Sequence, residues 1–305
     1  MSEESDSLRT SPSVASLSEN ELLPAPEPLG YVCSLTEELV TKAKEELQEK
    51  PEWRLRDVQA LRDMVRKEYP NLSTSLDDAF LLRFLRARKF DYDRALQLLV
   101  NYHSCRRSWP EVFNNLKPSA LKDVLASGFL TVLPHTDPRG CHILCIRPDR
   151  WIPSSYPITE NIRAIYLTLE KLIQSEETQV NGIVILADYK GVSLSKASHF
   201  GPFIAKKVIG ILQFFLHGSD LNSLHTNLPR SILPKEYGGT AGELDITAWN
   251  EVLLASEEVF VREFCQPVPA CDSILGEALL PEGLTSDAQC DDSMRAMKSQ
   301  LYSCY

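Results

Sequence analysis

Residues 181–191 read NGIVILADYKG and hold five consecutive apolar side chains between Gly182 and Asp188. If this run is extended, both of its faces are apolar, because side chains alternate between the two faces of a strand. Strands of that kind are typical of parallel or mixed sheets that are covered on each side. The stretch therefore predicts a buried inner strand at 183–187.

The segments around this strand continue the same pattern. Two short β-rich runs, 129–134 and 141–147, are joined by the turn sequence HTDPRG and predict a hairpin. Long helices are predicted over 158–177, before the inner strand in the sequence, and over 195–213, after it. This alternation of strands and helices predicts an α/β domain with a mixed, mainly parallel sheet.

The N-terminal third of the folded region predicts helices instead. Ser34 and Glu37 have the spacing of a capping box, which predicts a helix that runs to Lys50. A second helix follows, and then a helix pair in which Asp91 can cap the second member. Together these segments predict a small helical module.

The chain is predicted to have four parts. These are a disordered tail rich in acids and serine (1–33), a helical N-terminal module (34–108), an α/β domain (109–265) and a loose C-terminal tail (266–305). The α/β domain is expected to end in one helix over 246–264.

Composition excludes several classes of protein. The net charge of −10 argues against nucleic acid as a partner, and no apolar run approaches the roughly 18 residues of a membrane-spanning helix. The eight cysteines form no C-x-x-C pair and accompany no histidine cluster, so we expect no metal site. No glycine-rich phosphate loop is present, and we expect no cofactor. The polar start is unlike a signal peptide, so we predict a cytoplasmic protein. We also expect the protein to be a monomer.

Ser193 and Ser195 offer a catalytic alternative, since Asp188 and His199 lie close to them in the sequence. Neither serine lies in a G-x-S-x-G turn. The simpler interpretation is that Asp188 caps a turn or the next helix and that Gly191 supplies a permissive backbone. We therefore expect that the protein has no catalytic residue and is not an enzyme. The alternative is an esterase.

Three arginines, Arg83, Arg86 and Arg88, lie on the polar side of the apolar helix predicted around FLLRFLRAR. One interpretation is a solvated helix face. The other is a site for an anionic headgroup, because a guanidinium group holds phosphate oxygens through paired hydrogen bonds.

Three motifs in this order resemble those of the CRAL-TRIO lipid-binding family. They are FLLRFLRARKFDYDRAL (80–96), TQVNGIVILADYKGVSLSKA (178–197) and LPKEYGG (233–239), and the resemblance covers about residues 50–265. It implies a helical N-terminal module and an α/β domain that encloses an apolar pocket.

The resemblance also implies site residues. The pocket would have the inner strand as one wall and the long helix before it as another; the residues are Ile183, Ile185 and Ala187 on the strand, and Ile162, Ile165, Tyr166 and Leu169 on the helix. The family further implies recognition of phosphoinositide headgroups by basic residues. Arg88 matches one such position, with Arg86 and Arg83 beside it.

The sequence departs from the family pattern at one junction. A predicted helix ends near Gln213 and a strand-like run begins at Phe214, with no turn residue between them. Family members have a further inner strand and a mobile lid helix there, so the junction predicts an internal deletion such as exon skipping in alternative splicing produces. We expect a distorted sheet and weakened ligand binding, unless 214–217 occupies the vacant position in the sheet.

The leading hypothesis is a non-enzymatic carrier. It would bind a lipid or a lipid-soluble vitamin, transport it between membranes, and associate reversibly with phosphoinositide-containing membrane surfaces. The alternative is an interaction or regulatory scaffold that holds no lipid.

Overall fold

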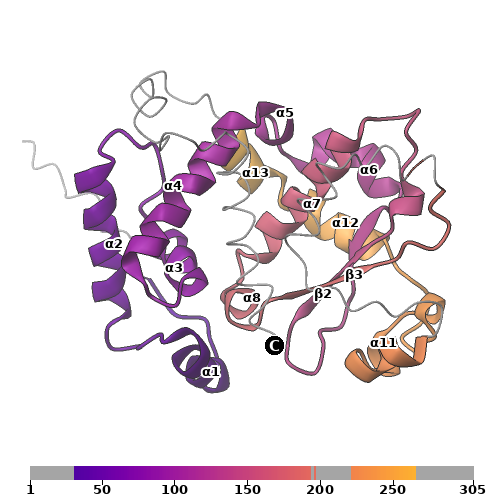
Figure 1. The fold of residues 1–305 in the computed structure, drawn as a ribbon, viewed down its shortest axis with the longest axis horizontal. Helices are drawn as coiled ribbons and strands as arrows, with labels where there is room; N and C mark the ends of the chain where they lie inside the picture. The colour runs from indigo at the N-terminus through magenta and orange to yellow at the C-terminus, as the bar shows by residue number, and fades with distance from the viewer. Residues whose placement is uncertain (1–30, 194–195, 197–220, 266–305) are drawn as a thin grey trace, which may run out of the picture. The chain divides into compact units, whose positions relative to one another are not determined.

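The computed structural model describes residues 31–193, 196 and 221–265, and Figure 1 shows its ribbon. The chain divides into two compact units, Met1–Val32 and Cys33–Tyr305. The helical module and the α/β part that the sequence predicts therefore belong to one unit. The predicted boundaries near residues 108 and 265 stay predictions.

Helices α1 to α4 form the N-terminal part of the second unit (Figure 1). Their bounds are α1 (Glu37–Leu47), α2 (Arg54–Glu68), α3 (Asp78–Ala87) and α4 (Tyr92–Ser108). Helices α2, α3 and α4 pack against one another, whereas α1 contacts α8 (Glu176–Asn181) of the α/β part. The predicted helical module is confirmed.

The start of α1 differs from the prediction. Its N-cap is Thr36, whose side chain accepts a hydrogen bond from the backbone N–H of Leu39. The predicted Ser34 cap is wrong, because the Ser34 hydroxyl donates to Glu176 instead. The predicted cap at the start of α4 is confirmed, since the side chain of Asp91 accepts from a backbone N–H in the first turn.

The remaining elements follow in chain order. They are α5 (Pro110–Phe113), η1 (Pro118–Leu121), α6 (Lys122–Ala126), β1 (Leu130–Val132), β2 (His142–Ile146), η2 (Pro148–Arg150), α7 (Ile158–Leu172), α8, β3 (Ile183–Ala187), α11 (Leu221–Asn227), η3 (Arg230–Ile232), η4 (Lys235–Tyr237), α12 (Thr247–Leu254) and α13 (Glu257–Phe264).

The described sheet has the strand order β1-β2-β3. Strands β1 and β2 form the predicted antiparallel hairpin. Strand β3 pairs with β2 in parallel, with Leu144 opposite Ile185. The sheet is therefore mixed, as predicted, and within the described residues it holds one pairing of each kind.

Two predicted helices are each broken in two. The helix expected over 158–177 stops at Leu172, because Ser175 caps the new helix α8 by accepting from the backbone N–H of Thr178. The helix expected over 246–264 divides at Ser256. The hydroxyl of Ser256 donates to the carbonyl oxygen of Val252 at 2.8 Å, a local bond that competes with a regular helix.

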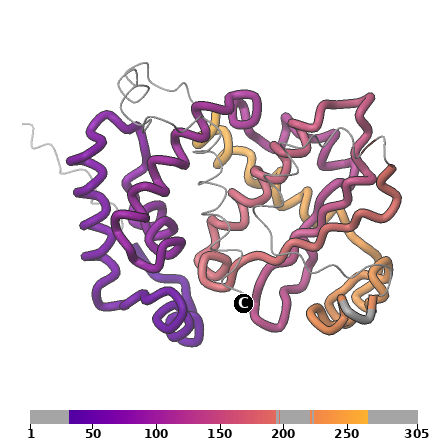
Figure 2. Tube along the Cα trace, in the orientation of Figure 1, coloured from indigo at the N-terminus to yellow at the C-terminus, as the bar shows by residue number. Residues whose placement is uncertain are grey.

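The core lies on both faces of the sheet. On one face, Leu144 and Ile183 belong to a cluster with α7, α12 and α13. On the other face, Ile143 and Cys145 belong to a cluster with α11 and the turn after it. The trace in Figure 2 shows the orange α11 segment and the α7 segment on different sides of the strands. Both faces of β3 thus have apolar neighbours, as its sequence predicts.

Three predictions lie outside the described residues. These are the helix over 195–213, the junction at Gln213 and Phe214, and the two tails.

Candidate functional site

The first part of the candidate site is the face of β3 that points toward α7. Ile183 is buried in the cluster that contains the α7 side chains. Ile185 and Ala187 share its face, because side chains on a strand alternate, and both are half-buried. One face of β3 therefore changes from core to partly accessible along its length.

The second part is the apolar side of α7. Ile162 and Ile165 are half-buried and pack against the same cluster. Tyr166 and Leu169 are buried, and the Tyr166 ring meets Phe113 edge to face with 4.8 Å between ring centroids. Helix α7 thus combines side chains that fill the core with side chains that border it.

The residues predicted as a pocket fall into two groups. Tyr166, Leu169 and Ile183 are core. The half-buried group, which we call the apolar wall, consists of Ile162, Ile165, Ile185 and Ala187. The strand and the helix are thus brought to one cluster, as the resemblance implies, while the contact of these residues with a ligand stays a prediction.

The LPKEYGG segment supports the sheet from its other face. The Tyr237 hydroxyl lies 3.2 Å from the Cys145 sulfur on β2, and both side chains are buried. Burial raises the pKa of the Cys145 thiol to about 11, so the thiol is protonated at neutral pH and is a weak nucleophile. Gly239 lies against the Leu233 carbonyl, where an added Cβ would sit 1.8 Å from the oxygen.

Arg83 is buried rather than solvated. Its guanidinium group lies 4.1 Å from the Phe80 ring centroid and 5.2 Å from that of Tyr102. Its Nη1 atom is 3.5 Å from Glu170 of α7, whose side chain is also buried. Burial, with a further contribution from Glu170, raises the pKa of Tyr102 to about 12. Arg83 therefore links α3 to α4 and α7.

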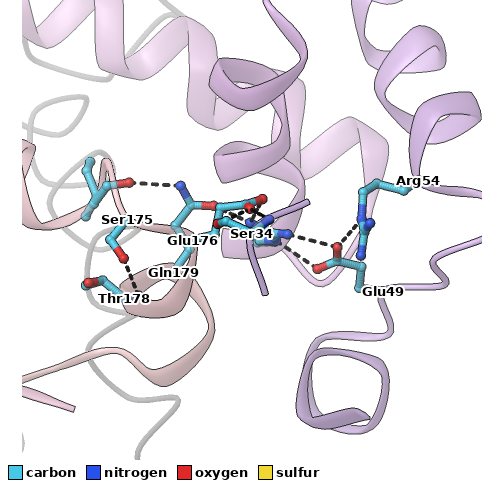
Figure 3. Close-up of polar contacts among 9 residues, drawn as sticks. Ser34, Glu49, Arg54, Ser175, Glu176, Thr178 and Gln179 are labelled. Carbon is cyan, nitrogen blue, oxygen red and sulfur yellow. Dashed lines mark hydrogen bonds and ion pairs between the residues drawn. The ribbon is translucent and has the colours of Figure 1, made fainter. Parts of the chain in front are cut away.

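Arg86 is fully enclosed by two carboxylates and an amide. Its Nε and Nη2 atoms donate to Glu49 at 2.8 and 3.0 Å. Its Nη1 donates to Glu176 at 3.0 Å and to the Gln179 side chain at 2.8 Å. Arg54 also donates to Glu49, and Figure 3 shows this pair beside Glu176 and Gln179. The predicted solvated face is wrong for Arg83 and Arg86, because α3 is covered on this side too.

Sequence reasoning missed the acidic partners of Arg86. Glu49 lies 37 positions before it and Glu176 lies 90 positions after it. A usable signal was present, since a cation within an apolar helix requires a buried partner. That rule identifies the need for an acid and not which of the chain's acids supplies it.

Arg88 differs from the other two arginines. It follows the last residue of α3 and is half-buried, and its Nη1 donates to the Ala87 carbonyl at 3.3 Å. Of the three arginines, it is the one that the interior does not enclose. The recognition of a headgroup by any of them stays a prediction.

The polar residues after β3 have structural partners. The Asp188 carboxylate accepts from the backbone N–H of Lys190 at 2.9 Å, which is the turn cap that the simpler interpretation predicts. Gly191 has a φ of 82°, which favours glycine. The Ser193 hydroxyl accepts from the backbone N–H of Lys196 at 3.2 Å. Ser195 and His199 lie outside the described residues.

Two kinds of site are absent from the described ranges, a cluster of metal ligands and a membrane-spanning helix. No three His, Cys, Asp or Glu side chains gather there in a way that could hold a metal ion. No helix in the part of the chain that the structure describes is long and apolar enough to cross a membrane.

Comparison with known proteins gives two family matches. The family model for the CRAL/TRIO domain matches residues 126–214, and the model for the CRAL/TRIO N-terminal domain matches residues 37–101. The two matches fall on the α/β part and on helices α1 to α4.

The chain is also similar to named relatives. It is 84% identical over 342 residues to "Alpha-tocopherol transfer protein-like" of Homo sapiens, with 100% of both chains covered. It is 81% identical over 343 residues to the protein of that name in Mus musculus, again with 100% of both covered. Its identity to Clavesin-1 of Pongo abelii is 34% over 264 residues, which cover 73% of this chain and 74% of the relative.

The alignment with the human relative shows a difference in length. It spans 342 positions and this chain has 305 residues, so at least 37 positions of the relative face gaps. Because the match covers both chains from end to end, these gaps are internal. The CRAL/TRIO match ends at residue 214, beside the Gln213–Phe214 junction. Both facts agree with an internal deletion, and its position at that junction stays a prediction.

Proposed function

The chain belongs to the CRAL/TRIO family, and we propose that it binds a hydrophobic molecule and transfers it between membranes. The ligand class is a lipid or a lipid-soluble vitamin. The name of the relatives at 81% and 84% identity, alpha-tocopherol transfer protein-like, supports this class.

The observation that carries the proposal is the apolar wall. Ile162 and Ile165 of α7 pack against the core cluster and stay half-buried. Ile185 and Ala187 of β3 are half-buried on the strand face that also carries Ile183. Ligand sites for hydrophobic molecules are lined mainly by such side chains. Each isoleucine that a ligand covers contributes favourable free energy in proportion to the apolar area removed from water.

Transfer without an enzymatic reaction fits the polar residues that follow β3 and the thiol of β2. Asp188 and Ser193 are engaged in backbone turns, and the Cys145 thiol, on the other face of the sheet, is buried and protonated. The esterase alternative is tested with a double variant, Ser193→Ala with Ser195→Ala. If the double variant hydrolyses esters at the same rate as the unchanged protein, the alternative is removed.

Membrane association belongs to the same proposal. We assign the headgroup contact to Arg88, because Arg83 and Arg86 are buried against carboxylates. A guanidinium group at the end of α3 can hold phosphate oxygens. Cytoplasmic location, monomeric state and peripheral, reversible binding to phosphoinositide membranes complete the proposal.

Native mass spectrometry tests the proposal. The purified chain is incubated with vesicles of a total lipid extract, separated from them, and sprayed under non-denaturing conditions. We expect a bound species of lipid mass in the unchanged chain and several-fold less in Ile165→Gln. The matched control is Ile152→Gln, because Ile152 is 50% exposed on a loop outside the wall.

The internal gaps favour one second candidate, a scaffold that binds other proteins without lipid. A version with the missing residues of the human relative restored separates the two. Lipid in the restored chain and none in this one would assign carriage to the longer form and the scaffold to this one. Absence of lipid from both versions would overturn the carrier.

A further inference from the structure

Ser34 makes a two-point contact with the α/β part. Its backbone N–H donates to Oε2 of Glu176 at 2.7 Å, and its hydroxyl donates to the same oxygen at 2.6 Å. Figure 3 shows Ser34 beside Glu176. Ser34 is exposed and precedes α1 in a segment without helix or strand. The hydroxyl is thus accessible, and it is committed to a carboxylate 142 positions away.

The charges behind this contact are balanced. Oε1 of Glu176 accepts from Arg86, which also holds Glu49, and Glu49 accepts from Arg54. Two carboxylates therefore face two guanidinium groups. The Arg86 side chain has 0% exposure and its donors are occupied by Glu49, Glu176 and Gln179. Among the described residues of this cluster, each guanidinium group is thus matched by a carboxylate.

Helix α1 depends on the same region for its position. Leu35 and Leu39 pack against a small cluster of Ala43, Leu47 and Val180, the last of which lies in α8. Lys42 donates to the Asn181 side chain at 2.9 Å. The Ser34 contact adds to this small interface at the N-terminal end of α1.

We propose that Ser34 is a phosphorylation site and that its modification releases α1 from α8. A protein kinase would transfer the γ-phosphoryl group of a nucleoside triphosphate to the serine oxygen. The new O–P bond replaces the β–γ anhydride bond, the hydroxyl proton goes to the kinase base, and the nucleoside diphosphate leaves. Glu37 and Glu38 follow the serine, so the kinase would be one that accepts acidic sequences.

Release follows from the change at the oxygen. Phosphorylation replaces a hydroxyl donor by a group that carries about −1.5 to −2 charges at pH 7 and is mainly a hydrogen-bond acceptor. That group would face the Glu176 carboxylate, and like charges at this distance repel. Arg86 cannot turn outward to meet the phosphate, because it is enclosed. The Ser34 segment must therefore move away, and α1 loses its tether.

The consequence reaches the apolar wall by a short path. Helix α8 ends at Asn181, and Gly182 joins it directly to β3. Loosening α1 on α8 would therefore loosen the start of β3. The inference concerns α1 itself and does not depend on whether the chain carries a lipid.

Hydrogen exchange tests the inference in the full chain. The protein is incubated with an acid-directed serine kinase and nucleoside triphosphate, and phosphate on Ser34 is located by mass spectrometry. We expect amide exchange in α1 to become roughly tenfold faster or more in the phosphorylated protein and in Ser34→Asp. Exchange in α2 and α4 should stay unchanged. Ser34→Asn, of similar size and without charge, should change α1 much less.

Ser119 supplies a second control. It too is exposed, and its backbone N–H and its hydroxyl donate to the carboxylate of Glu257. Ser119→Asp should therefore loosen α13 and leave α1 protected. The inference is overturned if the kinase places no phosphate on Ser34, or if phosphate on Ser34 leaves exchange in α1 equal or slower. Slower exchange would mean that the phosphate has captured an arginine.

Discussion

Arg86 shows why a charged side chain can lie inside this protein. Its side chain has 0% exposure and its hydrogen bonds reach three side chains from the α1–α2 loop and from α8. Burying a guanidinium group is costly unless it is paired and hydrogen-bonded. The pairing therefore makes Arg86 a determinant of how the helical module packs on the α/β part.

Arg86→Met should destabilise the protein strongly. The substitution leaves Glu176 without its buried cation and Glu49 with Arg54 as its remaining partner. Removing one member of a buried ion pair costs about 3–5 kcal/mol. Urea unfolding followed by circular dichroism measures the free energy of unfolding.

Arg66→Met is the matched control for that experiment. Arg66 pairs with Asp63 at 3.9 Å, with side chains 60% and 63% exposed. Exposed pairs of this kind contribute up to about 1 kcal/mol. Equal losses of stability in the two variants would contradict the structural role of Arg86.

The elements of the fold were predictable from the sequence to different degrees. The inner strand was predictable because its five apolar residues leave few alternatives, and the Asp91 cap was predictable too. The breaks at Ser175 and Ser256 were not, because apolar side chains continue past both and hide the local hydroxyl bonds. The α1 cap was assigned to Ser34 because Ser34 and Glu37 have capping-box spacing, whereas Thr36, two positions later, is the N-cap.

The turn after η4 gives a prediction at the same scale. Gly239→Ala would place a Cβ 1.8 Å from the Leu233 carbonyl oxygen, a backbone atom that cannot swing away. We expect a loss of about 3 kcal/mol or more in the free energy of unfolding. Gly242→Ala meets no atom within 4 Å, and its φ of 102° should cost about 1–2 kcal/mol. Chemical denaturation of both variants checks this order, and a smaller loss for Gly239→Ala would contradict it.

His103 on helix α4 should make the free energy of unfolding depend on pH. Burial, together with Arg106, Arg83 and Arg107, lowers the pKa of His103 to about 3. The unfolded chain binds a proton at this histidine below about pH 6.5, whereas the folded chain does not until about pH 3. The free energy of unfolding therefore falls as the pH drops from 6.5 toward 3.

His103→Gln isolates that contribution. Glutamine does not titrate and can still reach the Thr74 hydroxyl, which lies 2.7 Å from His103 Nε2. Between pH 7 and pH 4 the unchanged protein should lose about 2–3 kcal/mol more than the variant. Denaturation curves at a series of pH values give the two slopes, and parallel slopes would show that His103 is not buried in its neutral form.

At the scale of the whole molecule, the sequence indicated the family and part of the site. Three separated motifs and two apolar periodicities placed β3 and α7 against one core. The sequence could not separate core from wall among the seven pocket residues, because both kinds are apolar at the same helical or strand spacing. Nor could it place the arginines, whose burial depends on acids from distant segments.

Methyl NMR tests the central claim, that the apolar wall contacts a hydrophobic ligand, most directly. The isoleucine δ1 methyl groups are labelled with ¹³C in a deuterated chain that is loaded from a total lipid extract. The account predicts nuclear Overhauser effects between lipid protons and the methyls of Ile162, Ile165 and Ile185, and none at Ile152. Lipid contacts at Ile152 with none at the three wall methyls would contradict it.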